Sequence, residues 1–330
     1  MSGNILKVKL SPGLGAAGPS AVETATPEYT RADRLAAWKA RWGIGRMAHR
    51  VKPGLYALGA PGADSPVFAT ANYKLSFDAL RVNLKGLNAW ILVLDTRGVN
   101  VWCAAGKGTF GTPELARIIA ETGLEKRVNH RKVILPQLGA PGVSAHRLKA
   151  YTGFSAVFGP VRAEDIPEYL RLGRATPGMR RVRFNLMDRM ILAPVQLVHF
   201  GRYMLPAAAL LYALGYTEDA AYTAGALFAG GALVPALLPW LPGRSFAVKS
   251  AAAGLLVTAI IALSHDQTTA QFAARALIYG AAASFVGLDF TGASTYTSLS
   301  GVKKEMRLAM PAHALAFASG LAILAAGRFL

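Results

Sequence analysis

One short segment combines residue types that could do chemistry: Asn100-Val-Trp-Cys-Ala-Ala-Gly-Lys-Gly108. Asn100 is a favourable helix N-cap, which predicts a helix with Cys103 in its first turn. The partial positive charge of a helix N-terminus favours a thiolate at that position. Lys107 lies four residues further on and therefore on the same helix face. The segment predicts a reactive or metal-binding cysteine.

The residues after the cysteine are small. Ala104, Ala105, Gly106 and Gly108 remove bulk from the predicted helix, so a large flat ligand could lie against it. Each glycine also weakens a helix by about 1 kcal/mol relative to alanine. Stability alone does not explain this choice of residues.

Other interpretations of Cys103 stay open at this point. A free cysteine is commonly a small buried hydrophobic residue. A phosphate-binding P-loop is excluded, because it needs a glycine where Val101 stands and Ser or Thr where Gly108 stands. A Cys–His dyad would need one of three histidines: His49, His130 or His146.

The elements around this segment alternate between short apolar runs and amphipathic stretches. Residues 1–27 are expected to form a loose arm and 28–42 a helix. The alternation predicts an α/β domain, Rossmann-like, with a mostly parallel sheet whose ligands bind beyond the carboxyl ends of the strands. Strands are expected at 54–59, 66–70, 88–95, 131–136, 155–158 and 181–185. Helices are expected at 74–86, 101–123, 141–151 and 163–172.

The composition excludes several classes of site. The chain has 330 residues, and its single cysteine rules out an intramolecular disulfide, a CxxC pair and an iron–sulfur cluster held by this chain alone. Any electrons must come from another protein. The formal net charge is +18, with 28 Lys and Arg against 13 Asp and Glu in residues 1–190. The basic residues are not interleaved with aromatic ones and no nucleic-acid-binding motif occurs, so we expect no nucleic-acid partner.

Residues 191–330 are poor in charge and rich in Ala, Leu and Gly. We expect three regions: an N-terminal arm and helix (1–48), a cytoplasmic α/β domain (49–190) and an all-α transmembrane domain (191–330). Small residues in the last region suit close helix packing in lipid. Five spans are predicted, near 193–216, 219–241, 246–264, 270–288 and 308–327.

The charges of the connecting loops predict the orientation. Arg244 with Lys249, and the group Lys303, Lys304 and Arg307, lie in alternate loops, whereas the other loops carry acidic residues. The positive-inside rule places residues 1–190 in the cytoplasm and the C-terminus outside a cytoplasmic membrane. No signal peptide is expected at the N-terminus. Three ionisable residues within the spans could mark a polar pathway, but snorkelling or structural pairing is the favoured interpretation: His199, Arg202 and Arg275.

The segment 100–108 resembles the cap-helix signature of the corrinoid protein of microbial mercury methylation, the HgcA family. The stretches 71–80, 135–142 and 158–163 also resemble that family, so the resemblance covers roughly residues 50–190. The five-span region agrees in architecture only. The resemblance implies a corrinoid-binding domain similar to that of the corrinoid iron–sulfur protein of acetyl-CoA synthesis.

The family further implies that Cys103 is catalytic and is the lower axial ligand to the cobalt of a base-off corrinoid. The cofactor would also be contacted by Thr70, Asn100, Val101, Trp102, Ala104, Ala105, Gly106, Lys107 and Gly108. The implied reaction is transfer of a methyl group from cobalt to Hg(II). An anionic thiolate would supply the electron density that this transfer demands.

The implied partners are a ferredoxin-like iron–sulfur protein (HgcB type), which would donate electrons and could carry Hg(II), and methyltetrahydrofolate or its methyltransferase as the methyl source. Membrane lipid is the further partner. Two other functions stay open: a corrinoid methyl carrier for a different acceptor in one-carbon metabolism, and a membrane transporter with a cytoplasmic regulatory domain. Paired intramembrane carboxylates, which a transporter would need, are absent from residues 191–330.

Overall fold

The structure is a computed structural model that describes residues 21–293 and 299–327. The described chain divides into two compact units. The first comprises residues up to 37 and 45–181, and the second comprises 38–44 and the residues from 182 onward. The unit boundary at 181/182 therefore comes slightly before the expected boundary at 190. Each unit is described separately below.

The first unit is built on a six-stranded sheet with the order β1-β2-β4-β3-β5-β6. All neighbouring pairs are parallel except β2 with β4, so the expectation of a mostly parallel sheet is confirmed. The strands are β1 (Glu23–Ala25), β2 (Gly54–Leu58), β3 (Val67–Ala71), β4 (Ala89–Leu94), β5 (Lys132–Leu135) and β6 (Ser155–Phe158).

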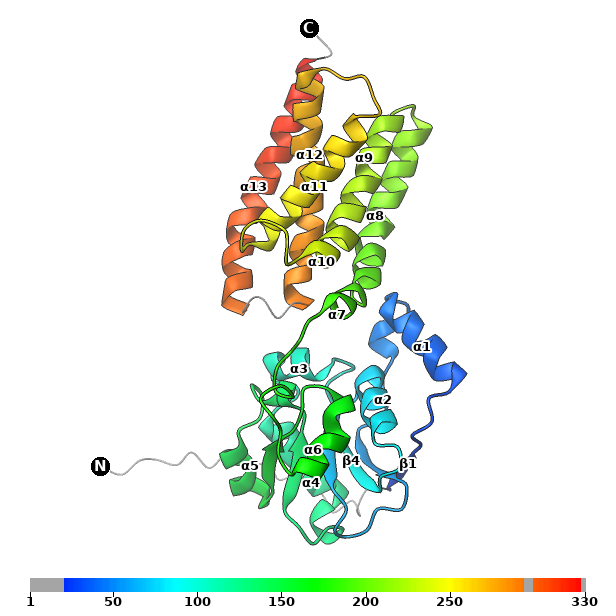
Figure 1. Ribbon diagram of the computed structural model, residues 1–330, viewed down its shortest axis with the longest axis vertical. Helices are drawn as coiled ribbons and strands as arrows, with labels where there is room; N and C mark the ends of the chain where they lie inside the picture. Colours follow the sequence, from blue (N-terminus) through cyan, green and yellow to red (C-terminus); the bar gives the residue numbers. More distant parts are fainter. Residues whose placement is uncertain (1–20, 294–298, 328–330) are drawn as a thin grey trace, which may run out of the picture. The chain divides into compact units, whose positions relative to one another are not determined.

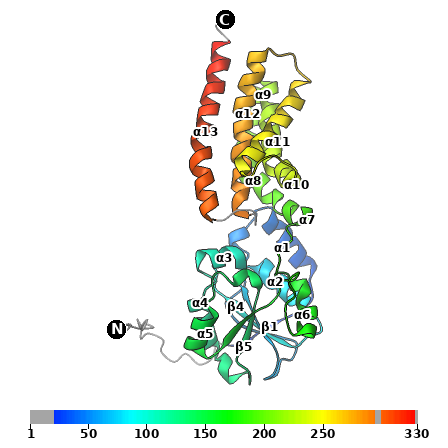
Figure 2. The same cartoon turned by 60° about the vertical axis from the view of Figure 1, so that its left-hand side comes forward.

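Helices cover both faces of this sheet (Figures 1 and 2). Strand β4 is buried along its whole length, as expected of a central strand with helices on both sides. Residues of α3, α4 and α5 pack on one face, and residues of α2 and α6 pack on the other. The helices are α1 (Arg31–Arg41), α2 (Lys74–Asn83), α3 (Val101–Lys107), α4 (Thr112–Thr122), α5 (Ala145–Thr152) and α6 (Ile166–Leu172).

Three sequence-based expectations for this unit were wrong. Residues 23–25, expected in a loose arm, pair with β2 in the sheet. The single helix expected over 101–123 is two helices, because Gly108 has a φ of 81° and ends α3, and Gly111 begins α4. Residues 181–185 form no strand; Phe184 has a φ of 46° and is buried with Phe290 in the second unit.

The second unit consists of helices. Its members are α7 (Leu186–Met190), α8 (Ala193–Ala213), α9 (Thr217–Phe228), α10 (Val234–Leu237), α11 (Phe246–Ala262), α12 (Thr269–Asp289) and α13 (Leu299–Ala326). A π-helical stretch, Ala229–Leu233, joins α9 to α10. Helix α13 lies beside α12 in both views, and α9 lies beside α8 (Figures 1 and 2).

Helices occur at all five predicted spans, but membrane crossing by all five stays a prediction. Three segments are long and apolar enough to cross a membrane by length and composition: Thr217–Leu237, Thr269–Asp289 and Ser300–Ala326. Helix α11 is apolar but has only 17 residues. Helix α8 has 21 residues but carries polar side chains, including His199 and Arg202.

Small residues bring the helices of this unit close together, as predicted. A Cβ atom at Gly230 would lie 2.6 Å from the carbonyl oxygen of Ala283 on α12.

Arg275 forms ion pairs with Glu218 at 2.6 Å and Asp219 at 3.5 Å. The predicted structural pairing of Arg275 is therefore confirmed.

Candidate functional site

The Asn100 side chain caps the short helix that carries the cysteine. Its Oδ1 atom accepts a hydrogen bond from the backbone N–H of Cys103 at 2.9 Å. This bond satisfies one of the free donors at the helix N-terminus, so the predicted N-cap is confirmed. At the other end, Gly108 adopts the left-handed conformation that terminates α3.

The turn that leads into α3 is held by a buried side chain, Asn72, directly after β3. Asn72 is 2% exposed. Its Oδ1 atom accepts hydrogen bonds from Thr96 N at 3.1 Å, Thr96 Oγ1 at 2.9 Å and Gly98 N at 2.9 Å. Its Nδ2 group donates to Asp95 at 3.0 Å. One side chain therefore ties the end of β3 to the loop after β4 and sets where α3 begins.

The exposed face of α3 carries Cys103 and Lys107. Cys103 is half-buried, and Gly106 and Lys107, three and four residues later, are exposed. A Cβ atom added at Gly106 would meet no atom within 4 Å. The surface beside Cys103 is therefore open to a flat ligand.

The opposite face of α3 belongs to the core. Ala104 and Ala105, predicted to contact the cofactor, are 0% and 5% exposed and pack in the main hydrophobic cluster with Val101. A Cβ atom at Gly142 would lie 3.1 Å from Ala105 Cα and closer still to Phe110 O. The alanines are small because the 139–142 loop packs directly against α3. Their small size allows this close packing, and their contact with a cofactor stays a prediction.

A pocket of about 260 Å³ lies next to the start of α3. Strand β3 has β4 on one side and β5 on the other. Because the chain runs from β3 to β4 and then crosses over to β5, the strand order reverses between β3 and β5. Ligands of open α/β sheets bind at this reversal, beyond the carboxyl ends of the strands. The pocket is lined there by Thr70 of β3, Pro136 after β5, and the cap-helix residues Asn100, Val101 and Trp102.

Helix α2, which lines the other side of the pocket, is fixed by buried charges. Asp33 accepts from Lys74 at 2.7 Å and from Arg81 at 2.9 Å, and both cations also bind Asp78. Burial alone would raise the pKa of Asp33, but hydrogen bonds from Lys74, Thr30 and Arg81 together hold it well below its usual 3.8. The cluster ties α2, which forms part of the pocket wall, to α1.

Among the described residues, no group of three or more His, Cys, Asp or Glu side chains could hold a metal ion. His130 binds the Ser65 carbonyl oxygen at 2.9 Å. His146 is exposed on α5. The site therefore offers a bound metal complex one thiol ligand, from Cys103.

Sequence comparison links this site to known proteins. Residues 44–170 match the family model of the CO dehydrogenase/acetyl-CoA synthase delta subunit, CdhD. The matched residues include the sheet from β2 to β6, the cap helix and the pocket.

Relatives match the same part of the chain. The acetyl-CoA decarbonylase/synthase complex gamma subunit of Archaeoglobus fulgidus is 35% identical over 127 residues, which is 38% of this chain and 27% of the relative. The same subunit of Methanothermobacter thermautotrophicus gives the same figures. The corrinoid/iron–sulfur protein large subunit of Moorella thermoacetica is 28% identical over 129 residues, 38% of this chain and 28% of the relative. The chain thus spans about a quarter of the length of these relatives.

Sequence reasoning missed the structural role of Asn72 and Thr96. Both are buried, at 2% and 0% exposure. The available signal was a polar residue close after each of two buried strands, since Asn72 directly follows β3 and Thr96 comes two residues after the end of β4. Parallel strands end at the same edge of a sheet. Only the structure shows that the two residues bind each other.

Proposed function

We propose that this protein is a membrane-anchored, corrinoid-dependent methyl-transfer protein in which Cys103 binds the cobalt. The observation that carries the proposal is a single thiol, Cys103, on the exposed face of a capped helix. The first residues of this helix line the pocket between β3 and β5, and the whole site lies within the residues that match the CdhD family. The relative from Moorella thermoacetica is itself a corrinoid/iron–sulfur protein.

The residues present fit a corrinoid. On the face of α3 with Cys103, a Cβ atom at Gly106 would meet no atom within 4 Å, so a macrocycle would find open space there. The pocket of about 260 Å³ is smaller than most small-molecule sites, which are roughly 300–1,000 Å³. It would therefore take only a pendant part of the cofactor, leaving the ring on α3.

When bound, the corrinoid supplies a cobalt centre that accepts and releases a methyl group. The chain's own residues hold and tune it. The Cys103 thiolate would bind the cobalt, and the identity of its ligand strongly tunes a cofactor metal. Asn100 keeps the first turn of α3 in place. Lys107 lies on the same face of α3 and is exposed, so it could contact the cofactor beside Cys103.

We propose Hg(II) as the methyl acceptor, which would make the product methylmercury. The support is the cap-helix signature at 100–108, whose cysteine thiolate would donate electron density to the metal. A ferredoxin-like iron–sulfur protein would supply electrons, because this chain has one cysteine and cannot hold a cluster alone. Methyltetrahydrofolate or its methyltransferase would supply the methyl group.

The relatives favour a second candidate function. They are named as subunits of acetyl-CoA decarbonylase/synthase complexes, so the same domain could carry a methyl group to an acceptor of one-carbon metabolism instead. The two functions share the cofactor and Cys103, and they differ only in the acceptor.

The decisive experiment records ultraviolet–visible spectra of the corrinoid-reconstituted full chain. Wild type is compared with Cys103→Ala and with Cys103→Ser, which keeps the side-chain size. Cobalt bands that shift on binding to wild type, but not to either variant, are the expected result. Identical spectra for all three proteins would remove the role of Cys103, and failure of wild type to bind corrinoid would remove the cofactor.

The acceptor is tested with the loaded protein, a methyl source and a low-potential iron–sulfur reductant. Methylmercury should form when Hg(II) is added to wild type and not when it is added to Cys103→Ala. If methyl groups leave wild type only for other acceptors, the second candidate function is the correct one.

A further inference from the structure

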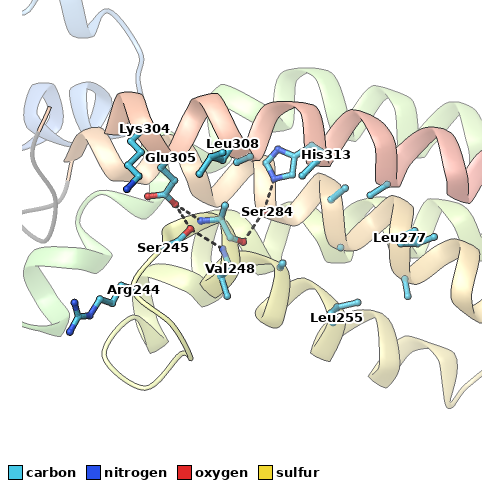
Figure 3. A pocket seen from close by; sticks show the side chains of 18 of the residues that line it. Arg244, Ser245, Val248, Leu255, Leu277, Ser284, Lys304, Glu305, Leu308 and His313 are labelled. Carbon is cyan, nitrogen blue, oxygen red and sulfur yellow. Dashed lines mark hydrogen bonds between the residues drawn. The ribbon is translucent and has the colours of Figure 1, made fainter. Parts of the chain in front are cut away.

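The second unit contains a long groove between α11, α12 and α13 (Figure 3). Its volume is about 920 Å³. Most of its wall is aliphatic and includes Leu255, Leu277, Leu308, Ala312 and Ala316. Only 11% of the most apolar stretch of α13 is buried. The groove therefore lies beside a helix whose surface is largely exposed.

One end of the groove is positively charged. Arg244 and Lys304 both line it and are exposed, and neither forms an ion pair within the part of the chain that the structure describes. The nearby carboxylate of Glu305 is already occupied, because it accepts hydrogen bonds from Ser245 Oγ and Ala247 N, each at 2.7 Å. Glu305 thereby caps α11, and the two cations are left to bind an anion.

The polar groups in the middle of the wall bind each other. Ser284 Oγ donates to the carbonyl oxygen of Ala247 at 2.8 Å, so its one proton is used there. The 2.7 Å contact with His313 Nε2 is then a hydrogen bond donated by the histidine ring (Figure 3). This pairing reduces the polarity that the wall presents beyond the charged end.

The length of the groove matches one leaflet of a bilayer. Lys304 and Ala316 both line it and are twelve residues apart on α13, which corresponds to about 18 Å at 1.5 Å per residue. Half of a hydrocarbon core is roughly 15 Å. The charged end is also the end that the loop charges assign to the cytoplasm, where the leaflet is rich in anionic lipid.

We propose that this groove binds an anionic phospholipid, with the phosphate between Arg244 and Lys304 and one acyl chain along α13. The proposal rests on the second unit being a membrane domain and does not depend on the corrinoid chemistry. It assigns the membrane unit a specific lipid site in addition to anchoring.

The test measures lipid binding by native mass spectrometry of the full chain in detergent. Phosphatidylglycerol and phosphatidylcholine with the same acyl chains are titrated separately. Wild type should prefer phosphatidylglycerol, and Arg244→Gln/Lys304→Gln should bind it about tenfold or more weakly, since each basic residue adds favourable attraction to anionic lipid.

The matched control is Lys303→Gln/Arg307→Gln, which removes two charges from exposed positions on α13 that do not line the groove. It should bind phosphatidylglycerol like wild type. A third variant, Ala312→Phe, should weaken binding of both lipids by filling the groove.

Three results would overturn the proposal: equal binding of both lipids by wild type, an equal loss in the two charge variants, or competition by glycerol phosphate, which has no acyl chain. Alkaline carbonate washing of membranes tests anchoring separately. A chain released by the wash would show that the membrane assignment itself is wrong.

Discussion

At the scale of single residues, the position of Cys103 depends on a side chain that never touches it. Asn72 makes four hydrogen bonds to the 95–98 turn, and that turn leads directly to the N-cap of α3. Removing the Asn72 side chain would leave its buried hydrogen-bond partners unsatisfied. Each such loss lowers the free energy of unfolding by roughly 1–3 kcal/mol.

Asn72→Ala should therefore loosen the 95–107 segment without unfolding the sheet. Hydrogen exchange of the full chain should show faster exchange in that segment, and the corrinoid should bind more weakly. Asn129→Ala is the control, because Asn129 is exposed, donates to Asp64 Oδ1 at 3.2 Å and does not line the pocket. Faster exchange spread over all strands would show instead that Asn72 stabilises the whole sheet.

At the scale of elements, α3 is a short helix whose two faces are under different constraints. The buried face is packed so closely on the 139–142 loop that a Cβ atom at Gly142 would lie 3.1 Å from Ala105 Cα. The exposed face, by contrast, has unfilled space at Gly106. Alanine is a better helix former than glycine by about 1 kcal/mol, so protein stability alone would favour alanine at position 106.

Gly106→Ala should accordingly stabilise α3 in the cofactor-free chain and weaken corrinoid binding. Hydrogen exchange of 101–107 measures the first effect, and titration with the corrinoid measures the second. Gly62→Ala is the control, because a Cβ atom there also meets no atom within 4 Å and the position lies away from α3. Unchanged corrinoid affinity in Gly106→Ala would place the ligand on another surface.

At the scale of the whole molecule, the density of charged residues differs between the two parts of the chain. Residues 1–190 hold 28 basic and 13 acidic residues, whereas residues 191–330 hold 8 and 5. Most of the basic residues of 191–330 lie in alternate loops, at Arg244, Lys249, Lys303, Lys304 and Arg307, and this pattern predicts that those loops stay in the cytoplasm.

Cysteine labelling can test this orientation, since Cys103→Ala removes the only native thiol. In that background, Asp266→Cys should react with a membrane-impermeant maleimide on intact cells. Lys303→Cys should react only after the membrane is opened. The reverse labelling pattern would show that the topology is inverted. Labelling of both variants on intact cells would contradict the predicted topology.

The sequence by itself determined the features that depend on neighbouring residues. The N-cap at Asn100 follows from local hydrogen bonding, the buried strand β4 from a continuous apolar run, and the apolar helices of the second unit from composition. These features need no knowledge of distant residues.

The tertiary structure decided which residues meet across long separations in the chain. It added β1 to the sheet, broke the 101–123 helix at Gly108, turned Ala104 and Ala105 into the core, and joined Asn72 to Thr96. It also brought α11, α12 and α13 together to form the groove. The physical reason is that pairing and close packing depend on partners far away in the sequence, which local propensity does not specify.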